Sequence, residues 1–248
     1  MGTDRVTHWG RHELPLVIAH RGASADAPEN TLSAFRRARS DGADGVELDV
    51  MRCGSGEVVV FHDDDLLRLG KRSGLTRQTP LAALREIDLG GGERIPTLDE
   101  ALEALDPMLI NIELKSTSKL RDDGLAASVA ELLARHDTGA RALVSSFDPW
   151  LLARFARRAP AIATGLLFAH DQSLPLRRAW SARVLRPTAL HPESLLVDAA
   201  SVRRWRARGF AVNVWTVDDP AELRLFVALG VDGVITNRPK NTRAVIQS

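Results

Sequence analysis

The 248-residue sequence has a single cysteine, Cys53, so no disulfide can form within the chain, which fits a reducing compartment. No run reaches about 18 consecutive apolar residues, so no transmembrane helix is expected. The first residues are polar and lack the apolar segment of a secretory signal, and we therefore expect a cytoplasmic protein. The net charge is only +1, which gives no reason to expect a nucleic-acid partner.

The rest of the composition is ordinary for a globular protein, with 44% hydrophobic and 26% charged residues. Short apolar segments alternate with helical segments along the chain, which indicates a parallel sheet buried on both faces. Nine segments have the character of strands: 16–20, 45–51, 58–62, 108–115, 142–147, 162–168, 195–197, 211–217 and 234–236.

The glycine-containing turn at 53–56 is too short for a helical crossover, so the strands on either side of it should form an antiparallel hairpin. If the turn centres between Gly54 and Ser55, residues whose numbers sum to 109 face each other, and Glu47 lies opposite His62. Removing the hairpin partner 58–62 from the nine segments leaves eight, which is the number of strands in a TIM barrel. Removing the weak segment 195–197 instead also leaves eight.

We therefore predict an α/β protein with the TIM (β/α)8 barrel fold in a single domain, since such barrels take about 250 residues. Residues 1–14 are expected to be a polar lead-in. Residues 15–248 are expected to form the barrel domain, with a short, loop-rich insertion around 63–95.

Acidic residues interrupt two of the buried strands. Glu47 and Asp49 are two residues apart and therefore share one face of their strand, and Glu113 lies in the strand at 108–115. The carboxyl ends of barrel strands meet at one rim, so the three carboxylates should converge there. Buried like charges need a cation between them, and oxygen ligands without cysteine point to one divalent cation, Mg²⁺ or Ca²⁺.

Two histidines and two basic residues accompany this acidic group. His20 closes the first strand and His62 closes the hairpin, and both titrate near neutrality, as a general acid and base must. With Arg21 and Lys115, the three carboxylates and a divalent cation leave one net positive charge, which a phosphodiester anion would neutralise. Phe147 and Trp215, near the ends of later strands, complete the predicted substrate-binding set with Arg21 and Lys115.

Simpler interpretations of these residues remain open. The acidic pair could belong to a buried ion network with Arg21 and Lys115, and Lys115 could be a solvated strand end. Trp215 could be a packing residue or an apolar wall for an alcohol group. Asn30 is expected to cap a helix, with Thr31 as the alternative cap, and His191 is expected at the surface.

Several stretches together match the pattern of one enzyme family. They are 18–22, 28–31, 45–50, 59–63, 111–115, 145–147, 214–217 and 232–236, and they follow the family order over nearly the whole chain. The family pattern His-Arg, Glu-x-Asp, His falls on His20-Arg21, Glu47/Asp49 and His62. The sequence thus resembles the glycerophosphodiester phosphodiesterases, and its short insertion is similar to that of their compact bacterial members.

The resemblance implies a TIM barrel whose metal is held by Glu47, Asp49 and Glu113. It implies acid and base roles for His20 and His62, and phosphate contacts from Arg21 and Lys115. The implied products are glycerol 3-phosphate and an alcohol such as choline or ethanolamine, with the neighbouring glycerol hydroxyl able to attack phosphorus first.

The sequence also departs from the family pattern. Asn237 stands where an aspartate is common, and Asp218 stands where an asparagine is common. The run after His62-Asp63-Asp64 differs as well, which leaves substrate preference open between a glycerophosphodiester and the acylated substrate of a lysophospholipase D. A barrel that binds phosphate esters without catalysis is the third interpretation, and association of the chain into a homo-oligomer is left open.

Overall fold

The computed structural model describes residues 8–10, 12, 14–116 and 123–247. Within these residues nine strands form one sheet in the order β1-β9-β8-β7-β6-β5-β4-β2-β3. The strands are β1 Leu16–His20, β2 Gly45–Arg52, β3 Val58–Val60, β4 Leu109–Leu114, β5 Ala142–Ser146, β6 Ala163–Phe168, β7 Ala189–Pro192, β8 Ala211–Val214 and β9 Gly233–Thr236.

Pairing of β1 with both β2 and β9 closes eight parallel strands into a barrel, and β3 pairs antiparallel with the outer part of β2. The predicted TIM barrel is therefore confirmed. One strand prediction was wrong: residues 194–196 form a short 3-10 helix, and the barrel strand is β7, just before it. Leu195 carries an apolar side chain but is 70% exposed, whereas all four residues of β7 are buried.

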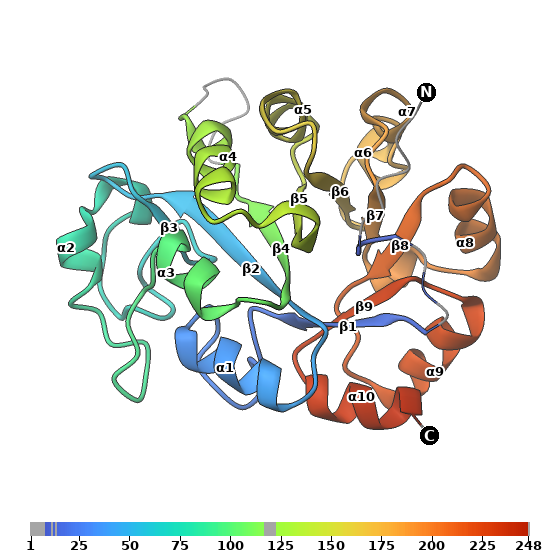
Figure 1. Ribbon diagram of the computed structural model, residues 1–248, viewed down its shortest axis with the longest axis horizontal. Helices are drawn as coiled ribbons and strands as arrows, with labels where there is room; N and C mark the ends of the chain where they lie inside the picture. The colour runs from blue at the N-terminus through green and yellow to red at the C-terminus, as the bar shows by residue number, and fades with distance from the viewer. Residues whose placement is uncertain (1–7, 11, 13, 117–122, 248) are drawn as a thin grey trace.

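Helices between the strands cover the outside of the barrel (Figure 1). They are α1 Leu32–Ser40, α2 Leu81–Leu84, α3 Leu98–Ala104, α4 Leu125–Arg135, α5 Pro149–Arg158, α6 Leu174–Arg177, α7 Ala182–Leu185, α8 Ala199–Arg206, α9 Pro220–Leu229 and α10 Pro239–Gln247. Short helices α6 and α7 stand between β6 and β7, where most other neighbouring barrel strands are joined by one longer helix. In the described part of the chain, no helix is long and apolar enough to cross a membrane.

The hairpin exists, but its predicted register was wrong by one residue. Met51 pairs with Val59, so facing residues sum to 110. The loop closes through Cys53, whose amide donates to the carbonyl of Glu57 and whose carbonyl accepts from Gly56. Glu47 therefore does not face His62, which lies beyond the end of β3.

An aromatic residue from the predicted lead-in closes the end of the barrel interior at which the strands begin. Trp9 is 1% exposed and packs in a cluster with Ile18, Leu143 and Ile235. Its indole nitrogen donates to the carbonyl of Arg141 at 2.9 Å. The lead-in is therefore not only polar, because it supplies the plug opposite the carboxyl ends of the strands.

The insertion around 63–95 has few regular elements but a core of its own. Its α2 helix is a single turn, Leu81–Leu84, and Leu66, Leu84 and Ile95 pack on Met51 and Phe61 of the hairpin region. The extension of β2 and β3 beyond the barrel thus supports the insertion at one side of the rim (Figure 1).

Candidate active site

A cavity of about 340 Å³ opens inside the carboxyl ends of the strands. Its lining includes eight of the nine site residues predicted from the sequence: His20, Arg21, Glu47, His62, Glu113, Lys115, Phe147 and Trp215. The ninth, Asp49, is 1% exposed and contacts Arg21 and Lys115 from below. Strand register brings these residues together, as the predicted rim requires.

The three carboxylates are neighbours because of the way in which β1, β2 and β4 pair. Glu47 lies beside His20 on one side, and Asp49 lies directly beside Glu113 on the other. Each of Glu47, Asp49 and Glu113 offers an oxygen within 4.8 Å of the others, and all three residues are buried. Two residues at an i, i+2 spacing and one register partner are enough to build this cluster.

Burial and mutual repulsion act on the protonation of these groups. Burial raises the pKa of Glu47 well above its usual range, and the charges of Asp49 and Glu113 add to the shift. Burial also raises the pKa of Glu113 to about 7, although Lys115 acts against it. Burial would raise the pKa of Asp49 too, but Lys115 and Arg21 more than offset it, and the pKa falls below its usual range. Asp49 is thus the carboxylate that stays ionised.

Two cations hold the ionised carboxylate from both sides. Lys115 Nζ lies 2.8 Å from Asp49 Oδ1 and 2.7 Å from Glu113 Oε1, and Arg21 Nε lies 3.2 Å from Asp49 Oδ2. Lys115 is mostly buried and bonded to two carboxylates, so the interpretation of it as a solvated strand end is wrong. Arg21 is oriented by a second acid, Glu29, at 2.9 Å.

Each of the two histidines that line the cavity is oriented through its Nδ1 atom. His20 Nδ1 lies 2.7 Å from Asn237 Oδ1, and His62 Nδ1 lies 2.7 Å from Asp63 Oδ1. Burial lowers the pKa of both histidines below the usual value. With Nδ1 bonded to an acceptor, each ring keeps its proton there and leaves Nε2 able to accept one.

Asn30 was wrongly expected to be the helix cap. The cap of α1 is Thr31, whose hydroxyl accepts from the amide of Ala34 at 3.3 Å. Asn30 is fully buried with a positive φ of 58°, and its Nδ2 donates to Asp49 Oδ2 at 2.8 Å. Asparagine tolerates this left-handed conformation better than most residues. The conformation turns the side-chain amide of Asn30 toward the acidic cluster.

Two of the departures from the family pattern, Asp218 and Asn237, contact each other. Asp218 Oδ2 accepts a hydrogen bond from Asn237 Nδ2 at 2.6 Å, and Asp218 Oδ1 accepts from the amide of Asn237 and from Thr236 Oγ1. Asn237 Oδ1 accepts in turn from Ser24 Oγ at 2.8 Å and from His20. A carboxylate only accepts, so Asp218 fixes which end of the Asn237 amide faces His20.

An apolar wall completes the cavity. The rings of Phe147 and Trp215 meet edge to face with centroids 5.5 Å apart, and Trp215 Nε1 donates to the carbonyl of His191 at 2.8 Å. His191 is fully buried, so its predicted surface location was wrong. Burial lowers the pKa of His191 to about 3, and it is a neutral core histidine that contacts Asn213 at 3.0 Å.

The fold and this rim define a TIM-barrel protein with an acidic, histidine-flanked centre. The model of the glycerophosphoryl diester phosphodiesterase family matches residues 20–241, and the chain belongs to that family. A curated glycerophosphodiester phosphodiesterase from Caldanaerobacter subterraneus is 34% identical over 234 residues, which cover 91% of this chain and 95% of that protein.

Solved structures are similar over the whole barrel. A phosphodiesterase of Oleispira antarctica, solved in complex with the product sn-glycerol-3-phosphate, is 35% identical with a TM-score of 0.85, covering 95% of this chain and 98% of the other. A glycerophosphodiester phosphodiesterase of Thermotoga maritima is 31% identical with a TM-score of 0.77, covering 95% and 100%.

The acidic cluster fits a divalent metal site. Three buried oxygen donors lie within reach of one ion, and no thiolate contributes, which suits a hard cation such as Mg²⁺ or Ca²⁺. Burial, with the charge of neighbouring carboxylates as a second cause, raises the pKa of Glu47 and of Glu113, and a cation bound among them would favour their ionised forms.

We expect binding of Ca²⁺ or Mg²⁺ to weaken as the pH falls below about 7, because the proton of Glu113 must leave before its oxygen can ligate. Isothermal titration calorimetry should show a loss of affinity of at least roughly tenfold in total between pH ~8 and ~6, and any proton that Glu47 also releases adds to it. Glu47→Gln should weaken binding at every pH, whereas the exposed Glu86→Gln should not. Equal affinities in the two variants, or no pH dependence, would contradict this assignment.

Proposed function

We propose that the protein hydrolyses glycerophosphodiesters to glycerol 3-phosphate and an alcohol, with His20 and His62 as general acid and base and a divalent cation bound by Glu47, Asp49 and Glu113. The observation that carries this proposal is the convergence of both imidazoles and the acidic cluster on one cavity. The Oleispira relative, which binds the product sn-glycerol-3-phosphate in a barrel of the same shape, supports the substrate class.

The cationic side chains of the rim bind the phosphodiester. Arg21 and Lys115 both line the cavity, and each is held by carboxylates that restrict its position. A pre-oriented guanidinium matches two phosphate oxygens, and the ammonium adds a point charge. When bound, a divalent cation would supply Lewis-acid polarisation of a non-bridging phosphate oxygen.

The histidines move the protons of the reaction. One Nε2 takes a proton from the attacking hydroxyl or water, and the other donates a proton to the oxygen of the leaving alcohol. Hydrogen bonds from Nδ1 to Asn237 and Asp63 hold each ring so that Nε2 is the reactive atom. Asp63 is itself held by Arg68 at 2.6 Å, which keeps the His62 ring in place.

The apolar wall bears on the alternatives. Phe147, Leu167 and Trp215 line the cavity beside the charged groups, and they offer a surface for a head group. A lysophospholipase D would need this wall to continue as a path for an acyl chain, and a cavity of about 340 Å³ is small for that purpose. Binding of a phosphate ester alone requires no proton transfer. A barrel that only binds such esters would therefore not need two imidazoles whose Nε2 atoms can accept a proton.

We expect choline to be released from glycerophosphocholine and not from lysophosphatidylcholine, in assays with Mg²⁺ or Ca²⁺, and EDTA to abolish the release. Release mainly from lysophosphatidylcholine would establish the lysophospholipase D alternative. Release from neither substrate under any metal would leave the binding barrel.

His20→Ala and His62→Ala should each lower kcat for glycerophosphocholine by at least about 100-fold, because each removes a proton-transfer group. Circular dichroism should show an unchanged fold, and the exposed His12→Ala serves as the matched control. A variant that keeps near wild-type kcat would remove that histidine from the mechanism.

The Asp218–Asn237 pair is a positioning device for His20, and exchanging its members tests this role. Asp218→Asn frees the Asn237 amide to turn over and present its NH2 group to His20, and Asn237→Asp places two carboxylates face to face. Each single change should lower kcat by at least about tenfold. The double exchange restores one donor and one acceptor in line and should recover most of the lost kcat.

The tautomer of His20, read from ¹⁵N NMR shifts of the imidazole, separates positioning from general destabilisation. It should change in Asp218→Asn and return in the double exchange. A double exchange that is no better than the worse single variant would contradict the role of the pair.

A further inference from the structure

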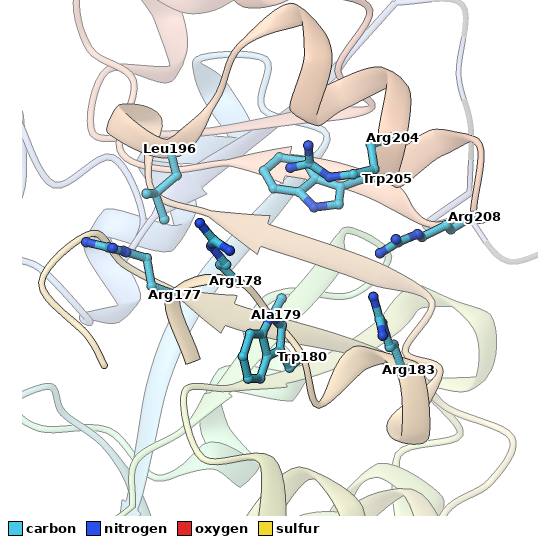
Figure 2. Close-up of a pocket in the computed structure, with 9 residues that line it drawn as sticks. All are labelled: Arg177, Arg178, Ala179, Trp180, Arg183, Leu196, Arg204, Trp205 and Arg208. Atoms are coloured by element: carbon cyan, nitrogen blue, oxygen red, sulfur yellow. The ribbon is translucent and has the colours of Figure 1, made fainter. Parts of the chain in front are cut away.

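A second and larger cavity, of about 600 Å³, lies outside the barrel between the α6–α7 segment and α8. Five arginines and two tryptophans line it together with Ala179 and Leu196: Arg177, Arg178, Arg183, Arg204, Arg208, Trp180 and Trp205. Figure 2 shows guanidinium groups reaching into the space from both walls, with Arg183 and Arg208 directed toward each other. We call this feature the arginine groove.

Few acidic residues lie near the groove, and the one whose charge acts on a groove arginine, Asp198 on Arg204, does so from beyond ion-pair distance. Residues 171–210 contain eight arginines but only the acids Asp171, Glu193 and Asp198, and Glu193 is bonded to His170 at 2.6 Å. In the described part of the chain, no ion pair within 4.0 Å joins any of the five groove arginines to a carboxylate. Arg204 instead stacks over the Trp205 ring at 5.8 Å. Unpaired guanidinium groups that crowd into a hollow point to an anionic partner.

Exposed apolar side chains border the same groove. Trp180 is 50% exposed, Leu174 42%, Val184 86% and Leu195 70%, and all four lie on the segments that form one wall and the rim. They are half of the eight large hydrophobic residues that are exposed in the described chain. A soluble anion or a nucleic-acid backbone has no need of exposed aliphatic residues, whereas a lipid surface offers phosphate groups and an apolar interior together.

The groove is connected to the rim of the active site. Arg177 Nη1 donates to the carbonyl of His170, whose ring binds Glu193, and the next residue, Ser194, donates its amide to the carbonyl of Trp215 at 2.8 Å. Trp215 lines the catalytic cavity. These contacts therefore link the Arg177 end of the groove to one wall of the catalytic cavity.

We propose that the arginine groove, bordered by Leu174, Trp180, Val184 and Leu195, docks the protein on the anionic phospholipid headgroups of a membrane surface. Guanidinium groups bind headgroup phosphates, and Trp180 with its aliphatic neighbours enters the interfacial layer. The binding is peripheral and depends on salt, because exposed charges are screened in strong electrolyte.

Co-sedimentation with large unilamellar vesicles tests the proposal. The wild-type chain should bind vesicles of phosphatidylcholine and phosphatidylglycerol in about equal amounts, and not vesicles of phosphatidylcholine alone. Arg178→Glu/Arg183→Glu should lower the partition coefficient by at least roughly 30-fold, since each basic residue near an anionic surface contributes roughly fivefold. The matched control, Lys71→Glu/Arg72→Glu, makes the same charge change on the insertion at the other side of the barrel and should change binding much less.

The apolar border has its own test. Trp180→Ala should weaken vesicle binding at least roughly fivefold. The control is Leu225→Ala, which changes an exposed residue on α9 and should leave vesicle binding unchanged. All variants should keep wild-type hydrolysis of soluble glycerophosphocholine, which shows that they are folded and separates this test from that of the proposed function.

Three results would overturn the proposal. They are absence of binding to the anionic vesicles, an equal loss in the charge-matched control, and tight salt-sensitive binding of duplex DNA or RNA without vesicle binding. The last result would assign the groove to a nucleic acid.

Discussion

The site depends on the presence of three carboxylates in one buried place. Water is excluded from Glu47, Asp49 and Glu113, so their repulsion must be balanced by cations or removed by protonation. Lys115 and Arg21 balance one charge fully, and the raised pKa values of the other two show the remaining deficit. In the proposed function a divalent ion would remove that deficit, and an anionic phosphodiester would then have the cationic groups as its partners. The need for a cation is thus the common ground of the proposed metal and of the proposed sign of the substrate charge.

The barrel provides this arrangement through register. Parallel pairing of β2 with β4 sets Asp49 against Glu113, and pairing with β1 sets Glu47 against His20, so no loop has to fold precisely to assemble the centre. Loops instead supply the orienting groups. Asn30 reaches Asp49 from the turn before α1, and Asp63 holds His62 from the segment after the hairpin. The strands fix where the charges lie, and the loops fix how the reactive side chains are turned.

Local spacing explains which parts of this arrangement could be predicted from the sequence. The i, i+2 spacing of Glu47 and Asp49 and the polar residues at strand ends required no tertiary knowledge, and the barrel count followed from alternation. The missed strand β7 contains His191 and ends in proline, so it lacks the apolar run that marks its neighbours, while the apolar Leu195 nearby lies in a turn. The contact of Asp218 with Asn237 depends on the loops after β8 and β9 meeting at the rim, which no local pattern encodes. The two departures from the family pattern therefore looked independent in the sequence and are one exchanged pair in the structure.

The distribution of charge over the molecule is another property that the sequence alone did not predict. A net charge of +1 averages over a molecule whose basic residues are unevenly placed, and the segment 171–210 alone carries eight arginines against three acids. Where most barrel strands are joined by one longer helix, α6 and α7 are each a single turn, so the barrel wall is hollowed there and α8 forms the far side. Folding then gathers Arg177, Arg183 and Arg208 from separate segments into one hollow. Bulk charge therefore cannot exclude an anionic partner, because the field that a partner meets is set by the face it approaches.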